Sequence, residues 1–170
     1  MQPAVTSTAH DQVLAWFDEY KDSLYRYLRT MIENPADIDD VIQTTFVALL
    51  AKGDALRDIR YPKTYLYQIA RHKAMDIIRS HSNAAISLDG LLVEPGHDVM
   101  PKWLTAEQVN WALGHLTPIE RETVVLKVYD ELPFREVARI TGCLLPTAAT
   151  RYLRAMRKMR LLLEERHERA

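Results

Sequence analysis

The chain has 170 residues, 48% of them hydrophobic, so it can bury one ordinary core or two small ones. A net charge of −1 excludes binding to nucleic acid through bulk charge, and a single cysteine excludes an internal disulfide. No apolar run approaches the roughly 20 residues of a membrane span, and the first residues lack a secretory signal pattern. We therefore expect a globular protein of the cytoplasm.

The first two predicted elements are helices. Apolar residues recur at intervals of three and four over residues 11–33, which predicts a scaffold helix. Asn34 and Pro35 end it, and with Asp37 they provide cap candidates for a second helix over residues 38–52. Its outward side mixes acidic, polar and apolar residues: Asp39, Asp40, Gln43, Thr44 and Val47. The acids near its start complement the helix dipole, whereas the mixed face as a whole suits docking to a protein.

Residues 61–80 predict an amphipathic helix that begins at Tyr61-Pro62 and carries a basic outer face. Residues 60–80 hold five Lys or Arg against one acid. The predicted outer face holds Gln68, Arg71, His72, Met75 and Arg79. Tyr65 and Tyr67, near its start, would either fill the core or stack on bases. From this segment alone, a solvated basic face and a nucleic-acid site remain open.

Residues 81–102 contain glycine, proline and acids without periodicity, which predicts a flexible linker. Helical spacing resumes at residue 103, and Thr117-Pro118-Ile119-Glu120 has the pattern of a capping box with proline at the first helical position. We therefore expect an all-α fold of two small helical domains, residues 11–80 and 103–166, joined by that linker.

The last predicted elements form a helix-turn-helix. Pro133 precedes a short helix, Gly142 suits the left-handed position after it, and Pro146 begins a longer helix. Residues 151–170 hold seven Lys or Arg against three acids. Opposite its apolar stripe, the longer helix carries residues suited to base edges and phosphates: Thr147, Thr150, Arg151, Arg154, Arg157 and Lys158. Helical hairpins that bind no DNA share the pattern, so it does not decide the function alone.

Three motifs in this order resemble the extracytoplasmic-function (ECF) sigma factors, the small two-domain specificity subunits of bacterial RNA polymerase. They are DIDDVIQTTFVALL, PKTYLYQIARHKAMDIIR, and LTPIERETVVLKVYDELPFREVARITGC followed by TAATRYLRAM. The resemblance extends from about residue 14 to residue 163 and implies a region 2 domain, a linker and a region 4 domain. It implies that the first motif docks on the clamp helices of the largest polymerase subunit through Asp39, Asp40 and Gln43. Phe46 belongs to the same motif, but its phase favours packing.

By the same resemblance, the second motif recognises the promoter −10 element and the helix-turn-helix recognises the −35 element. The implied −10 contacts are Lys63, Tyr65, Arg71, His72, Lys73 and Arg79, with Asp76 holding His72 or Arg79 across one turn. The implied partners are core RNA polymerase (its clamp helices and its flap), promoter DNA, and an anti-sigma protein of a kind that is often membrane-anchored. The resemblance implies no covalent chemistry, cofactor, metal or small-molecule substrate.

The sequence departs from the family pattern at the two DNA-binding helices. His72 replaces a common Asn, while Leu144, Leu145 and Ala149 stand where the family usually has Ser, Glu and Lys. The −35 helix therefore has fewer polar side chains in its first turn, which shifts base reading to later residues. The spacing from Ile59 to Leu66 and the ATRYLRAM segment resemble the iron-uptake subgroup.

Two other classes of protein compete with this interpretation. A stand-alone helix-turn-helix regulator would explain the last two helices. It would not explain the mixed face of the second predicted helix or the basic, aromatic composition of the third. An enzyme is disfavoured, because the sequence has no phosphate-binding loop, no paired Cys/His metal spacing and no glycine-flanked nucleophile.

Overall fold

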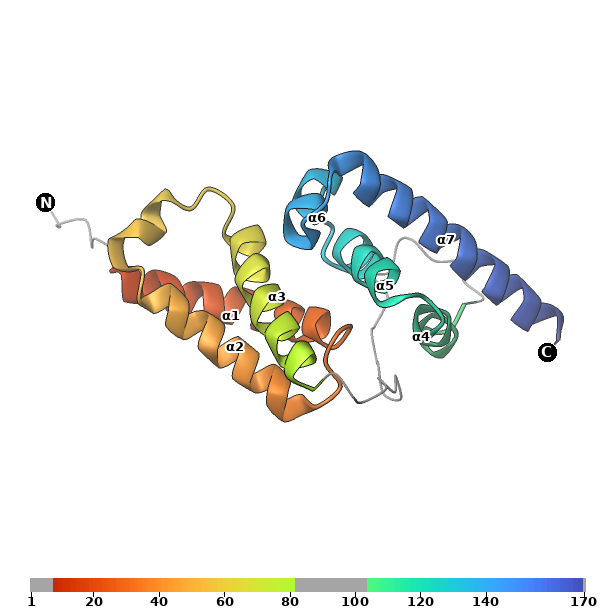
Figure 1. The fold of residues 1–170 in the computed structure, drawn as a ribbon, viewed down its shortest axis with the longest axis horizontal. Helices are drawn as coiled ribbons and strands as arrows, with labels where there is room; N and C mark the ends of the chain where they lie inside the picture. Colours follow the sequence, from red (N-terminus) through yellow and green to blue (C-terminus); the bar gives the residue numbers. More distant parts are fainter. Residues whose placement is uncertain (1–7, 82–103, 170) are drawn as a thin grey trace, which may run out of the picture.

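The computed structural model describes residues 8–81 and 104–169, and the regular structure of these two ranges is entirely helical (Figure 1). We call the two ranges the N-terminal and the C-terminal module. The predicted all-α fold is confirmed. Except for His81, the predicted linker lies outside the described residues.

The N-terminal module consists of α1 (Ala9–Leu28), α2 (Pro35–Leu50), the 3-10 helix η1 (Gly53–Asp58) and α3 (Pro62–Ser80). Thr8 and Asp11 form a capping box on α1. Asn34 caps α2, with Pro35 in its first turn, so α2 begins before the predicted residue 38. The first helix ends at Leu28 rather than near residue 33. Beyond its end, the backbone N–H and the hydroxyl of Thr30 both donate to the Tyr27 carbonyl, which satisfies that group within a tight turn.

The C-terminal module consists of α4 (Ala106–Gly114), α5 (Pro118–Val124), the π-helical turn η2 (Val125–Tyr129), α6 (Phe134–Thr141) and α7 (Leu145–Glu168). The predicted capping box of Thr117 and Glu120 is present on α5. Gly142 ends α6 at φ 67°, the left-handed conformation that the helix-turn-helix pattern predicts. A separate apolar cluster packs α4 and α5 against α7, with members that include Val109, Leu113, Val124, Ala155 and Met159.

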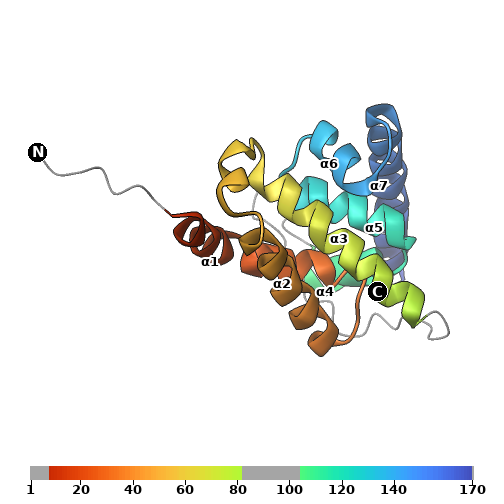
Figure 2. The ribbon, with the colours of Figure 1, turned by 60° about the vertical axis from the view of Figure 1, so that its left-hand side comes forward.

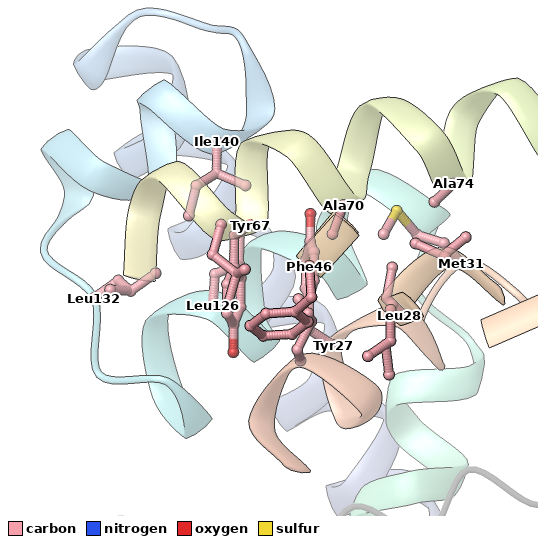
Figure 3. Packing of buried hydrophobic residues seen from close by; sticks show 14 of the residues in the cluster. Tyr27, Leu28, Met31, Phe46, Tyr67, Ala70, Ala74, Leu126, Leu132 and Ile140 are labelled. Carbon is pink, nitrogen blue, oxygen red and sulfur yellow. The ribbon is translucent and has the colours of Figure 1, made fainter. Parts of the chain in front are cut away.

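The two modules pack against each other along α3. In both views α3 lies between α1 and α2 on one side and α6 and α7 on the other, and α3 contacts α6 (Figures 1 and 2). The main apolar cluster contains buried residues of both modules, including Leu126, Leu132 and Ile140 beside Tyr27 and Tyr67 (Figure 3). In this conformation, two modules predicted as separate domains share a core.

Candidate polymerase and DNA interfaces

The outward face of α2 has the mixed chemistry that the sequence predicts. Asp39, Asp40, Gln43 and Val47 are exposed, and Val47 retains 58% of its accessible surface. The predicted contact Thr44 is half-buried, and its hydroxyl donates to the Val41 carbonyl at 3.2 Å. Carboxylates and apolar carbon are therefore both accessible on one face, as a protein-docking surface requires.

Two further residues define the limits of this face. Leu50 follows Val47 by three residues and is 42% exposed, so it continues the apolar part of the α2 face beyond Val47. Sequence reasoning missed it, although its spacing of seven from Gln43 was a usable signal. Phe46 is buried and packs edge-on against Phe17 with ring centroids 5.0 Å apart, which confirms its predicted packing role.

The exposed part of α3 is smaller than the sequence predicts. His72 and Arg79 are exposed, two turns apart on one face, and Asp76 pairs with Arg79 at 3.0 Å as expected. Lys73 is half-buried, as is Tyr65, whose ring lies 5.6 Å from the Lys52 ammonium. The sequence predicts that Tyr67 either fills the core or stacks on a base. It is fully buried, so in this structure it fills the core.

Arg71 and Lys63 do not form a solvated basic face, because each forms an ion pair with a carboxylate of the C-terminal module. Arg71 Nε lies 2.7 Å from Glu122 Oε1, and the two side chains are 19% and 4% exposed. Lys63 Nζ lies 3.5 Å from Asp130 Oδ1 and donates to the Asp130 carbonyl at 3.1 Å. Sequence reasoning singled out neither acid, because acids on a short helix are usually solvated.

Burial dominates the electrostatics where the modules meet. It raises the pKa of the Tyr27 and Tyr67 hydroxyls well above the usual value, and the neighbouring Glu122 and Asp130 charges add to the effect. Burial also raises the pKa of Asp130, since it outweighs the lysine and arginine that face this carboxyl. For Arg71, burial acts to lower the pKa of the guanidinium. The hydrogen bonds and the charge of Glu122 outweigh burial, so this pKa is raised.

The predicted −35 contacts all lie on α7, but they differ in their exposure to solvent. Thr150, Arg154 and Arg157 are exposed. Thr147 and Arg151 are half-buried, and Arg151 Nη1 is buried without a hydrogen-bond partner among the described residues. Lys158 pairs with Glu120 at 3.6 Å. The cations most available to phosphates are therefore those of Arg154 and Arg157.

Apolar residues on α7 complete this face. Leu153, between Thr150 and Arg154, is 63% exposed, while Leu144 and Leu145 at the start of the helix are 76% and 49% exposed. Leu144 occupies the cap position, where its side chain offers no hydrogen bond. Sequence reasoning did not propose Leu153, although it stands between two proposed contacts. Exposed aliphatic carbon at such a position suits contact with a thymine methyl in a major groove.

The described residues contain no group of three or more His, Cys, Asp or Glu placed to hold a metal ion. Within the same two ranges, no helix has the length and apolar character needed to cross a membrane. Neither observation adds a function to the surfaces described above.

The short helix α6, the left-handed Gly142 and the long helix α7 with its exposed arginines define a helix-turn-helix protein. The family model for Sigma-70 region 2 matches residues 16–84, and the model for Sigma-70 region 4 matches residues 107–159. The two matches together span most of the chain. The chain therefore belongs to the sigma-70 family of RNA polymerase sigma factors. Members of this family are transcription initiation factors rather than enzymes.

Curated relatives and solved structures agree with this family. The chain is 26% identical to the RNA polymerase sigma-E factor of Streptomyces avermitilis, over 93% of this chain and 90% of that protein. It is 24% identical to the ferric citrate uptake sigma factor FecI of Escherichia coli, over 84% and 85% of the two chains. Among solved structures, the sigma factor RpoE of Bartonella quintana, crystallised with the anti-sigma factor NepR, has a similar fold. Its TM-score is 0.64, at 20% identity over 88% of this chain and 97% of that one.

Proposed function

We propose that the α2 face of this sigma factor docks on the clamp helices of the largest subunit of core RNA polymerase. The docking residues are Asp39, Asp40, Gln43, Thr44 and Val47, extended by Leu50. The observation that carries the proposal is Val47, 58% exposed on a helix whose adjacent outward positions are acidic or amide. Isolated exposed apolar residues are ordinary, but a pair of them aligned with two acids suits a protein partner. A stand-alone regulator has no use for this face.

DNA recognition is divided between α3 and α7. The −10 contacts are Lys63, Tyr65, Arg71, His72, Lys73 and Arg79, which offer cations to phosphates and rings to unstacked bases. The −35 contacts are Thr147, Thr150, Arg151, Arg154, Arg157 and Lys158, joined by Leu153. Binding energy drives promoter melting, and catalysis stays with the polymerase. The protein acts in the cytoplasm, and an anti-sigma protein restrains it, as the complex of the Bartonella quintana relative suggests.

The experiment that tests the docking assignment is a core-binding measurement with Asp40→Arg combined with Gln43→Ala. Reversing a charge in the centre of a docking face should weaken core affinity by about 100-fold or more, because such changes cost several kcal/mol. Asp22→Arg is the control, since Asp22 is exposed on α1 and the charge change is the same. Wild-type affinity in the double variant would refute the docking face, and no binding by the wild type would favour the stand-alone regulator.

A finer proposal places the chain in the iron-uptake subgroup of ECF sigma factors. It is supported by the Ile59–Leu66 spacing and by the 24% identity to the ferric citrate uptake factor. If it is correct, deleting the gene should lower transcripts of an iron-transport operon under iron starvation. Unchanged iron-responsive transcription would rule the subgroup out and leave the sigma-factor family unaffected.

A further inference from the structure

The first turns of α7 carry two parallel lines of residues, one apolar and one largely polar. The members of the apolar line follow one another by four residues: Leu145, Ala149 and Leu153. The neighbouring line has the same spacing: Pro146, Thr150 and Arg154. Residues spaced by four lie on one side of a helix, so each set forms a continuous line along α7. Leu145 and Leu153 are exposed and Ala149 is half-buried, so the apolar line faces solvent.

The charges around the apolar line are all positive. The sequence between Glu136 and Glu164 contains no Asp or Glu, although it contains several arginines and a lysine. Of these cations, Arg154 and Arg157 are exposed on α7 beside the apolar line, at the outer edge of the C-terminal module (Figures 1 and 2). The docking face of α2, by contrast, combines its apolar residues with acids. Aliphatic carbon among cations complements a polyanion that also presents apolar groups.

Duplex DNA is a polyanion of this description. Its major groove admits an α-helix, and in a helix-turn-helix the residues near the start of the second helix contact the base edges. Among the four bases, thymine alone carries a methyl group on its major-groove edge. Leu145 and Leu153 are eight residues apart, about 12 Å along the helix, which spans roughly three to four base pairs. An apolar line of this length can therefore contact more than one thymine methyl.

The same turns of α7 lack most of the side chains that read bases through hydrogen bonds. Residues 145–151 contain no Asn, Gln, Asp, Glu or Lys. Asn and Gln pair with adenine, and Asp and Glu accept from cytosine, so these readings are absent from the stretch. Thr147 and Thr150 provide only single hydroxyls, and Arg151 has one guanidinium nitrogen buried. Apolar contact is therefore the main means of reading sequence that the start of α7 offers.

We infer that the apolar line reads thymine methyls in the −35 element, so that thymine is selected there by aliphatic contact. This methyl reading rests on the proposed −35 role of α7, and it names the chemical group that α7 recognises. Leu145 and Leu153 make the contacts. Ala149 has a short side chain, so it lets the helix approach the base edges between the two leucines.

Replacing thymine by deoxyuridine isolates the contact, because it removes the methyl group and keeps every hydrogen-bonding group of the base pair. The probe is a promoter fragment that reconstituted holoenzyme selects from duplexes with a randomised −35 segment. The same fragment is then prepared with deoxyuridine in that segment alone. Wild-type holoenzyme should lose affinity by about fourfold for each contacted methyl, the effect of withdrawing one methyl-sized group from apolar contact.

Leu145→Ala with Leu153→Ala should abolish this difference between the two fragments. Both leucines are exposed, so the variant should keep its fold, which its melting temperature checks. It should bind both fragments alike, about as weakly as the wild type binds the deoxyuridine fragment. The control is Leu161→Ala, which removes a similarly exposed leucine from α7 two turns beyond Leu153. The control should retain the full thymine preference.

A second variant changes the base preference instead of removing it. Leu145→Glu with Ala149→Lys introduces a side chain that accepts from cytosine and one that donates to guanine. When the selection is repeated with this variant, cytosine or guanine should be enriched where the wild type enriches thymine. Unchanged enrichment of thymine would overturn the assignment, since the apolar line would then not face the bases.

Failure of the methyl reading can be told apart from failure of the −35 role. Equal affinity of wild-type holoenzyme for the thymine and deoxyuridine fragments would overturn the methyl reading and leave the −35 role in place. A thymine preference that survives in the double leucine variant would overturn the role of the apolar line. If that variant also loses affinity for core polymerase, the line contacts a protein instead. If wild-type holoenzyme selects no −35 sequence, the −35 role fails and the methyl reading fails with it.

Discussion

Replacing Arg154 and Arg157 by alanine should reduce the salt dependence of DNA binding by an amount that follows from the structure. Both guanidinium groups are exposed on α7, and neither forms an ion pair with a described residue. If each contacts one phosphate, each contributes about 0.9 to the slope of log affinity against log salt concentration. The double variant should therefore lose about 1.8 from that slope.

The assay is fluorescence anisotropy with a mixed-sequence duplex, because phosphate contacts do not depend on sequence. Between about 50 and 200 mM salt, the wild type should lose about twelvefold more affinity than the double variant. The control is Arg160→Ala with Arg166→Ala, which removes the same charge from the same helix. Arg160 already pairs with Glu164 at 2.7 Å and Arg166 with Glu107 at 3.6 Å, so their loss should change the slope less.

Equal slopes for the wild type and the Arg154/Arg157 variant would refute the reasoning, since these cations would then contact no phosphate. A fall in slope matched by the Arg160/Arg166 control would also contradict it, because the effect would come from net charge rather than from position.

Three further predictions concern single positions. His72→Ala should weaken single-stranded −10 binding by the holoenzyme about tenfold without changing core affinity, because His72 is an exposed ring on α3 that we propose stacks on or donates to a base. Gly142→Ala should lower the unfolding temperature by about 2–4 °C, since a φ of 67° costs a side chain about 1 kcal/mol and no atom lies within 4 Å of the added Cβ. Burial raises the pKa of Asp130 above its usual value of 3.8. Between pH 3.8 and the raised pKa, the folded state therefore binds more protons than the unfolded state. The unfolding free energy of the wild type, compared with Asp130→Asn, should therefore rise as pH falls from about 7 to 4.

Each of these predictions has a specific contradicting result. Loss of core affinity in the His72 variant would place that residue in docking. An unchanged melting temperature in the Gly142 variant would mean that the turn relaxes without strain. A wild-type stability that falls relative to Asp130→Asn on acidification would mean that the ion pairs, not burial, control that carboxyl.

Local chemistry explains why the helix-turn-helix could be predicted from the sequence. Pro118 and the Thr117–Glu120 capping box fix the start of α5, and Gly142 fixes the end of α6, through atoms only a few residues apart. The outward positions of α2 follow from helical periodicity in the same way. These signals lie within single elements, so a sequence window contains all of the interacting groups.

The contact between the modules could not be predicted by the same reasoning. Glu122 bonds Arg71 across 51 residues and Tyr27 across 95, and in sequence it is indistinguishable from a solvated acid on a short helix. The available signal was a pair of stripes spaced by four and opposite in charge. One is Lys63, Tyr67 and Arg71 on α3, and the other is Glu122, Leu126 and Asp130, which runs from α5 through the π-helical turn that follows it. Many exposed helices carry such stripes for solubility, so their pairing became evident only in three dimensions.

The claim that the chain is a promoter-directing sigma factor is tested most directly by reconstituted transcription on genomic DNA of its own organism. Core polymerase without other sigma factors should give discrete run-off transcripts only when this protein is added. The upstream sequences of those transcripts should share two elements, near −35 and −10. Transcripts identical to those of core polymerase alone would contradict the account.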